Sequence, residues 1–174
     1  MVQSEGGCSQ GSSTGEFSIT FEIEPPAAVR PGTPFTLPVV VAVRPVGKVN
    51  PAVQHMVAYA SLRSETGAAA ATRPLGTLTS SVRNRNGNTT SGFAKFSPMS
   101  VVQPGRYRIR VILGAASHSG VTTKEYVDSG VIHVHAGAEA VQRPTPLQLS
   151  KLQAMTTENI DITPADIAAW QRGA

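Results

Sequence analysis

The first residues in this sequence whose chemistry suggests a function are arginines spaced for nucleic-acid contact. Arg83 and Arg85 alternate with asparagines through the polar run 84–88, which carries an Asn-Gly hairpin signal. Guanidinium and amide groups in a loop can reach both phosphate oxygens and base edges. A solvated hairpin tip would have the same composition, so both interpretations stay open at this point.

A second set of arginines alternates with apolar residues in Arg106-Tyr107-Arg108-Ile109-Arg110-Val111. This period of two predicts a strand with the arginines on one face and the apolar side chains on the other. The polar face of a half-buried strand is commonly just its solvent side. Three arginines without an acidic residue on the strand also suit an anionic ligand or an acidic partner chain.

Two histidines, His133 and His135, would lie on one face of a strand, as some zinc sites require. No third ligand is identifiable from spacing, although His118 or Asp128 could approach, so two partly exposed histidines are the simpler interpretation. The sequence has no Gly-x-Ser-x-Gly motif, no Gly-rich phosphate loop and no cysteine pair. We therefore expect a protein that is not an enzyme and needs no metal or other cofactor.

Charge is distributed unevenly along the chain. Residues 25–124 hold twelve Lys or Arg against one acid, a net charge of +11, whereas the whole chain carries +4. Such a one-sided block is typical of polyanion binders, and also of a solvated basic surface. No apolar run approaches the roughly 20 residues of a membrane span, and no secretory signal is visible. These features predict no membrane partner and no small-molecule substrate.

Gly and Pro turn signals separate short β-rich segments along most of the chain. Turn signals recur about every ten residues, a pattern that favours an all-β, immunoglobulin-like β-sandwich in residues 16–174, after a flexible tail over residues 1–15. The seven predicted strands span residues 17–24, 35–43, 53–62, 75–82, 92–96, 106–111 and 131–135.

Helix-capping patterns mark the last forty residues. Thr145-Pro146 is followed by Gln148, and Thr163-Pro164 is followed by Asp166, each an N-cap Thr, a Pro at the first helical position and a capping residue at the third. Apolar residues recur at helical spacing after both caps. The sequence therefore predicts two short C-terminal helices.

Residues 57–113 together resemble the velvet domain of fungal developmental regulators. The order and spacing of a Leu-x-Gly-x-x-x-Ser-Ser strand, a polar loop, a Gly-aromatic-x-x-Phe strand and a Gly-x-Tyr-Arg strand carry the resemblance. The matching residues are Leu75, Gly76, Ser80, Ser81, Gly92, Phe93, Phe96, Val101, Gly105, Tyr107 and Arg108. Downstream, residues 129–134 and 144–150 resemble the final strand and helix entry of the family.

The resemblance implies a Rel-like immunoglobulin fold, and a nuclear transcriptional regulator of fungal development and secondary metabolism that binds DNA as a homodimer or a velvet heterodimer. One alternative hypothesis is a module that pairs with velvet proteins without contacting DNA, because the loop over residues 24–35 offers a single arginine where the family carries a basic cluster. A less favoured one is an extracellular adhesion-type domain glycosylated at Asn88. The residues predicted to contact DNA are Arg30, Arg44, Lys48, Arg83 and Arg85.

Overall fold

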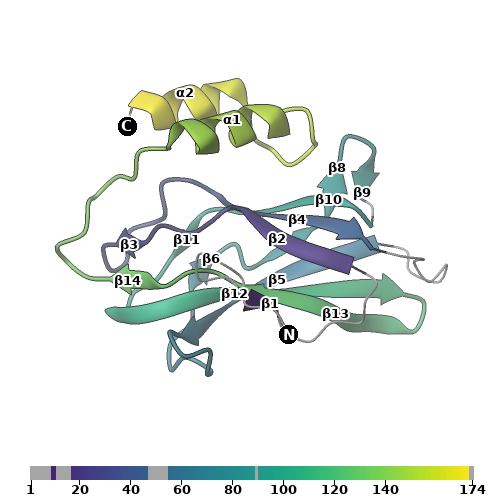
Figure 1. The fold of residues 1–174 in the computed structure, drawn as a ribbon, viewed down its shortest axis with the longest axis horizontal. Coiled ribbons are helices and arrows are strands. Elements are labelled where there is room, and N and C mark those ends of the chain that lie inside the picture. Colours follow the sequence, from purple (N-terminus) through teal and green to yellow (C-terminus); the bar gives the residue numbers. More distant parts are fainter. Residues whose placement is uncertain (1–8, 11–16, 47–54, 89, 173–174) are drawn as a thin grey trace.

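The computed structural model describes residues 9–10, 17–46, 55–88 and 90–172, which form a mainly β structure with several sheets and two C-terminal helices (Figure 1). A seven-stranded sheet contains β1 (Ser9–Gln10), β3 (Ala28–Val29), β5 (His55–Ser64), β7 (Thr79–Ser81), β12 (Gly105–Ser117), β13 (Gly120–Asp128) and β14 (Ile132–Val134). A five-stranded sheet has the order β2 (Phe17–Ile23), β4 (Val39–Pro45), β10 (Gly92–Phe96), β8 (Arg83–Asn84) and β9 (Gly87–Asn88). The short strands β6 (Leu75–Gly76) and β11 (Met99–Ser100) pair with each other.

Side chains from both large sheets meet in one hydrophobic core. Phe17 and Ile19 of β2 contribute from the five-stranded sheet, and Ile109 and Val111 of β12 contribute from the seven-stranded sheet. Alternate residues of β2 from Phe17 to Phe21 and of β12 from Tyr107 to Leu113 pack into this core, because successive side chains of a strand point to opposite faces. The alternation predicted for residues 106–111 is confirmed. In β2 a bulge between Phe21 and Ile23 interrupts the alternation and places Ile23 in a second apolar cluster, with Leu152 and Met155.

The helices α1 (Pro146–Met155) and α2 (Pro164–Arg172) cover the outer face of the five-stranded sheet, which lies between them and the seven-stranded sheet (Figure 1). Strand β4 is consequently buried on both faces: Val41 belongs to the core between the sheets, whereas Val40 packs with Leu152 and Met155 beneath the helices. A strand covered on both sides must be apolar throughout. This explains the continuous run of buried residues 39–43.

Both predicted helix caps are present. Thr145 Oγ1 accepts the backbone N–H of Gln148, and the Gln148 side chain accepts the N–H of Thr145 in return. Thr163 and Asp166 form the same reciprocal pair at the start of α2. Each box satisfies two backbone donors that a helix start would otherwise leave unpaired. Neither helix, the only two among the described residues, is long and apolar enough to cross a membrane.

The observed strands differ from the predicted ones in two places. The single strand expected over residues 75–82 is wrong: β6 pairs with β11, whereas β7 pairs with β5 in the seven-stranded sheet. Between them the backbone N–H and hydroxyl of Thr77 donate to the carbonyls of Pro98 and Ser97, so the chain changes partners there. Strand β13 was not predicted, because its exposed first half, including Val121, shows no alternation.

Of the segment predicted to be a tail, only Ser9–Gln10 falls within the described residues, where it pairs with β13 as β1.

Tyr107 is fixed at the start of β12 by a hydrogen bond to its own approach loop. Its hydroxyl donates to the carbonyls of Gln103 and Pro104 at 3.1 and 3.2 Å. Gly105 makes this possible: its φ is 151°, and a Cβ there would lie 2.9 Å from Tyr107 Oη. A tyrosine bonded back to upstream backbone in this way occurs at the corner of many immunoglobulin-like domains.

Replacing Tyr107 by Phe should lower the free energy of unfolding by about 1 kcal/mol, the usual net value of one hydrogen bond. For a chain of this length that corresponds to a melting temperature lower by about 3 °C, measured by calorimetry. Tyr126→Phe is the matched control, because none of the described residues hydrogen-bonds the Tyr126 hydroxyl. Equal effects of the two variants would contradict the role assigned to the Tyr107 bond.

Candidate nucleic-acid interface

Two of the arginines predicted to contact DNA lie on the same face of the five-stranded sheet. Phe93 of β10 is opposite Ala42 of β4 on one side and Arg83 of β8 on the other. Phe93 packs against the cluster beneath the helices, so its neighbour Arg83 points to that outer face as well. Arg44 is two residues beyond Ala42 on the same face, and both arginines are exposed.

Lys95 also belongs to this group, although it was not among the residues predicted to contact DNA. Lys95 is two residues after Phe93 on β10 and therefore shares its face of the sheet. Its Nζ donates to the carbonyl of Asp161 in the segment between α1 and α2, at 2.9 Å. The burial of Ala94 and Phe96 on either side confirms that Lys95 points away from the core. We call Arg44, Arg83, Lys95 and the adjacent Arg85 the basic face.

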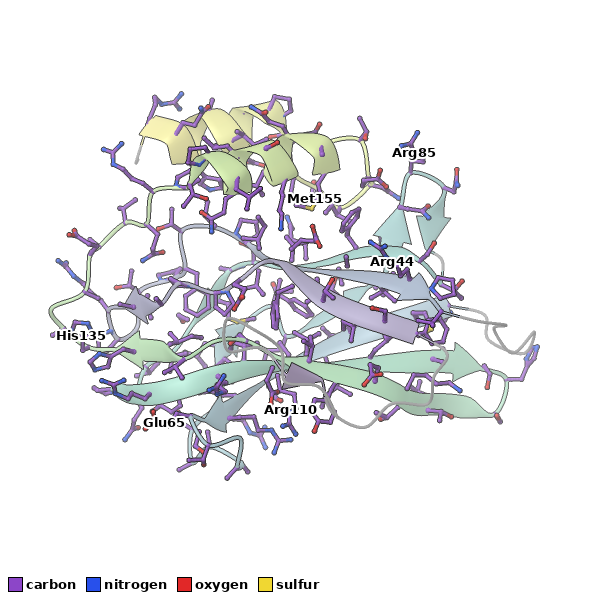
Figure 2. All side chains as sticks on the ribbon, viewed as in Figure 1. Arg44, Glu65, Arg85, Arg110, His135 and Met155 are labelled. Atoms are coloured by element: carbon purple, nitrogen blue, oxygen red, sulfur yellow. The ribbon has the colours of Figure 1, made fainter. Side chains whose placement is uncertain are left out.

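Arg85 lies at the tip of the β8–β9 hairpin, where Figure 2 shows it at the edge of the molecule. The hairpin exists as predicted, but Asn84 pairs with Gly87, so the turn is centred on Arg85 and Asn86. The Asn84 side chain accepts the N–H of Asn86 at 2.7 Å and donates to the carbonyl of Ser91. These bonds hold the tip in one conformation, as asparagine side chains do in many turns.

Gly92 lets β8 approach β10 closely enough to place Arg83. Its φ is 135°, and a Cβ at this position would lie 2.2 Å from the carbonyl oxygen of Arg83. Only glycine combines this backbone conformation with such close packing. Gly92 is therefore required for β8 to hold Arg83 in the basic face.

A pocket of about 400 Å³ lies in the basic face, between β10 and the segment that joins the helices. Arg83 and Lys95 line one side with the hydroxyls of Ser80 and Ser81, and residues 159–161 line the other. The joining segment also brings Glu158 to 3.5 Å from Arg85, with side chains 16% and 70% exposed. The Glu158 carboxylate and the Arg85 guanidinium thus meet next to residues that line this pocket.

The other predicted contact residues are not part of this group. Arg30 follows β3, far from the β8–β9 hairpin (Figure 1), and its Nε donates to the carbonyl of Ala138 at 2.7 Å. Lys48 lies outside the described residues, as does residue 89 of the possible glycosylation motif at Asn88. Of the five residues predicted to contact DNA, the structure therefore brings together Arg44, Arg83 and Arg85.

The arginines of β12 have largely structural roles. Arg110 forms a two-pronged ion pair with Asp128 of β13, with Nε–Oδ1 and Nη2–Oδ2 distances of 2.7 and 2.9 Å. Its guanidinium stacks on the Tyr126 ring at 3.9 Å, and the bond to Asp128 raises the pKa of Arg110. Arg108 donates to the carbonyls of Glu65 and Ser129. The acid that this strand lacked in the sequence comes from the neighbouring strand.

His133 and His135 stack with ring centroids 4.2 Å apart. Within the described residues no three His, Cys, Asp or Glu side chains gather as metal ligands. Loss of solvation, followed by the charges of His135 and Arg106, lowers the pKa of His133 below its ordinary value. His133 is therefore harder to protonate than a histidine in solution.

This depressed pKa predicts a dependence of stability on pH. The unfolded chain binds the His133 proton more readily than the folded one, so its contribution is complete above pH 6.5 and is lost as the pH falls toward the folded-state pKa. The melting temperature of the native protein should fall more between pH 7.5 and 5.5 than that of His133→Gln. Parallel curves in thermal melts would show that other groups cause the change.

The sequence matches no protein-family model and no curated protein.

Proposed function

We propose that this protein is a velvet-like transcriptional regulator that binds DNA through the basic face. In this proposal the two large sheets form a Rel-like immunoglobulin β-sandwich, and the protein acts in the nucleus, as a homodimer or with another velvet protein, in fungal development and secondary metabolism. The shared core of the two sheets and the upstream hydrogen bonds of Tyr107 support the fold. The resemblance of residues 57–113 to the velvet domain supports the family.

The observation that carries DNA binding is the gathering of four cations on one face. The side chain of Arg83 makes no hydrogen bond or ion pair with any described residue, so its guanidinium is available to a ligand. Strands are spaced by about 4.8 Å and residues by about 3.4 Å, which places the Cα atoms of Arg44 and Arg83 about 12 Å apart. Phosphates of one DNA strand advance by about 3.4 Å along the helix axis, so the two arginines would bind different phosphates.

Salt dependence tests this proposal directly. Fluorescence anisotropy with random duplex DNA should show binding whose log–log slope against salt is about −0.9 for each phosphate contacted, hence roughly −2 to −3 for the basic face. Screening is weaker at about 50 mM salt than in physiological buffer. If no salt-sensitive DNA binding is measured at that concentration, the proposal of DNA binding is refuted. Light scattering, alone and with a velvet protein, tests the dimer.

One observation favours the alternative, a module that pairs with velvet proteins without touching DNA. Two of the four cations of the basic face already have partners within the chain, because Arg85 faces Glu158 and Lys95 binds the carbonyl of Asp161. A protein partner would need fewer free cations than a DNA phosphate backbone. Failure of the anisotropy experiment with dimerisation retained would support this function.

Removing the acid at the rim should strengthen DNA binding. Glu158→Gln eliminates the carboxylate 3.5 Å from Arg85 and frees that guanidinium for phosphate. An exposed ion pair contributes up to about 1 kcal/mol, so we expect an affinity about three- to fivefold higher by anisotropy. Glu139→Gln changes the same charge away from the basic face. An equal gain in both variants would show a general effect of net charge and contradict a local role for Glu158.

A further inference from the structure

A second pocket, apart from the basic face, lies along the edge of β5. Strand β7 pairs with β5 as far as Tyr59, and beyond that point the loop over residues 65–74 folds against the strand. The backbone N–H of Ser64 donates to the carbonyl of Ala68 in this loop, and Arg63 forms a β-bridge with Ala69. The pocket between the strand and the loop is open to solvent and has a volume of about 350 Å³.

The walls of this pocket are mostly apolar, and its charged residues are both arginines. Ala60, Ala69, Ala70 and Leu78 contribute hydrocarbon, whereas Arg63 and Arg73 contribute two positive charges. None of the described residues that line the pocket is acidic. A cavity with this composition favours an anion that carries a short hydrocarbon body.

The side chain of Arg63 is the feature of this pocket that indicates a ligand. Its Nε is buried and has no hydrogen-bond partner among the described residues. Its cross-strand neighbour Arg108 is satisfied by the carbonyls of Glu65 and Ser129, so the same sheet face provides acceptors for one arginine and not the other. A buried charged donor without an acceptor is costly, and such groups commonly mark a site for an ion or ligand.

We propose that the pocket binds a small organic carboxylate through Arg63 and Arg73. The carboxylate would accept hydrogen bonds from the guanidinium groups of Arg63 and Arg73, because arginine donors match the geometry of an oxyanion. The hydrocarbon part would lie against Ala69, Ala70 and Leu78. The volume is at the lower end of the roughly 300–1,000 Å³ of ligand sites, which fits a short chain. This ligand site is independent of DNA binding.

The test is a titration of the full chain with acetate, butyrate, hexanoate and inorganic phosphate at constant ionic strength, followed by NMR of the arginine Nε–Hε signals. We expect the Arg63 signal to shift and the affinity to rise up to about fourfold for each added methylene that is buried. No shift of the Arg63 signal, or an affinity independent of chain length, would overturn the proposal. Phosphate binding as tight as hexanoate would also overturn it, because the apolar walls would then contribute nothing.

Matched variants separate the pocket from general charge effects. Arg63→Gln and the exposed Arg73→Gln should each weaken hexanoate binding roughly ten- to a hundredfold, the range for a lost charge-assisted hydrogen bond. Arg106→Gln removes one exposed charge outside the pocket and should leave the affinity unchanged. Equal losses in all three variants would overturn the assignment. Arg73→Gln keeps the test decisive if Arg63→Gln does not fold.

Discussion

Replacing Arg44 and Arg83 together by Glu is expected to lower the affinity for duplex DNA about a hundredfold and to flatten its salt slope by about two. Both arginines lie on the outer face of the five-stranded sheet, on either side of β10, and both are exposed. If each binds one phosphate, the variant loses two charge-assisted contacts and adds two repulsive charges. Anisotropy at several salt concentrations measures both effects.

The control for this experiment is Arg106→Glu with Arg143→Glu, which makes the same change in net charge at exposed positions away from the basic face. It should weaken binding only through the long-range field and leave most of the slope unchanged. Both double variants must keep the melting temperature of the native protein for the comparison to hold. Equal losses of affinity and slope would show that the basic face is not the contact surface.

Asp128→Asn should lower the free energy of unfolding by about 3 kcal/mol, which for this length is a melting temperature lower by roughly 6–12 °C. Asp128 and Arg110 are 6% and 16% exposed at their side chains, so the pair is largely shielded from water. The amide of Asn cannot supply the charge that balances the guanidinium. Arg110 would then remain held over Tyr126 without a counter-ion.

Two comparisons make this result interpretable. Arg106→Gln removes a charge from an exposed position of the same strand and should change the stability by less than about 0.5 kcal/mol. Arg110→Met with Asp128→Leu replaces both ions by apolar groups and should cost less than Asp128→Asn, because no unpaired charge is left. If the double variant is less stable than Asp128→Asn, the role assigned to the ion pair is wrong.

The sequence predicted a helix or strand well where the residues that determine it lie within the element itself. The alternation from Phe17 to Phe21 predicts its own strand, and the capping residues after Thr145 and Thr163 predict the starts of their own helices. The break between β6 and β7 depends on carbonyls about twenty residues away, at Ser97 and Pro98, and no period within residues 75–82 reveals it.

The candidate site was predicted only in part for the same reason. Arg83 and Arg85 stand out in the sequence as neighbours, but Arg44 joins them only because β10 pairs with both β4 and β8. Lys95 was overlooked because a single lysine between apolar residues suggests no function until its strand is placed. Asp128 likewise became the partner of Arg110 through the pairing of β12 with β13.

The burial of β4 on both faces has a consequence for how the chain is made. A ribosome releases the N-terminal part first, so Leu37 and Val40 emerge long before the helices over residues 146–172 that cover them. Until residues 146–172 are synthesised, the nascent chain therefore exposes an apolar strip on the outer face of the five-stranded sheet. Exposed apolar surface of this kind binds chaperones or other nascent chains. The C-terminal helices are thus the last of the described elements to form, and a chain that ended before residue 146 would leave that strip uncovered.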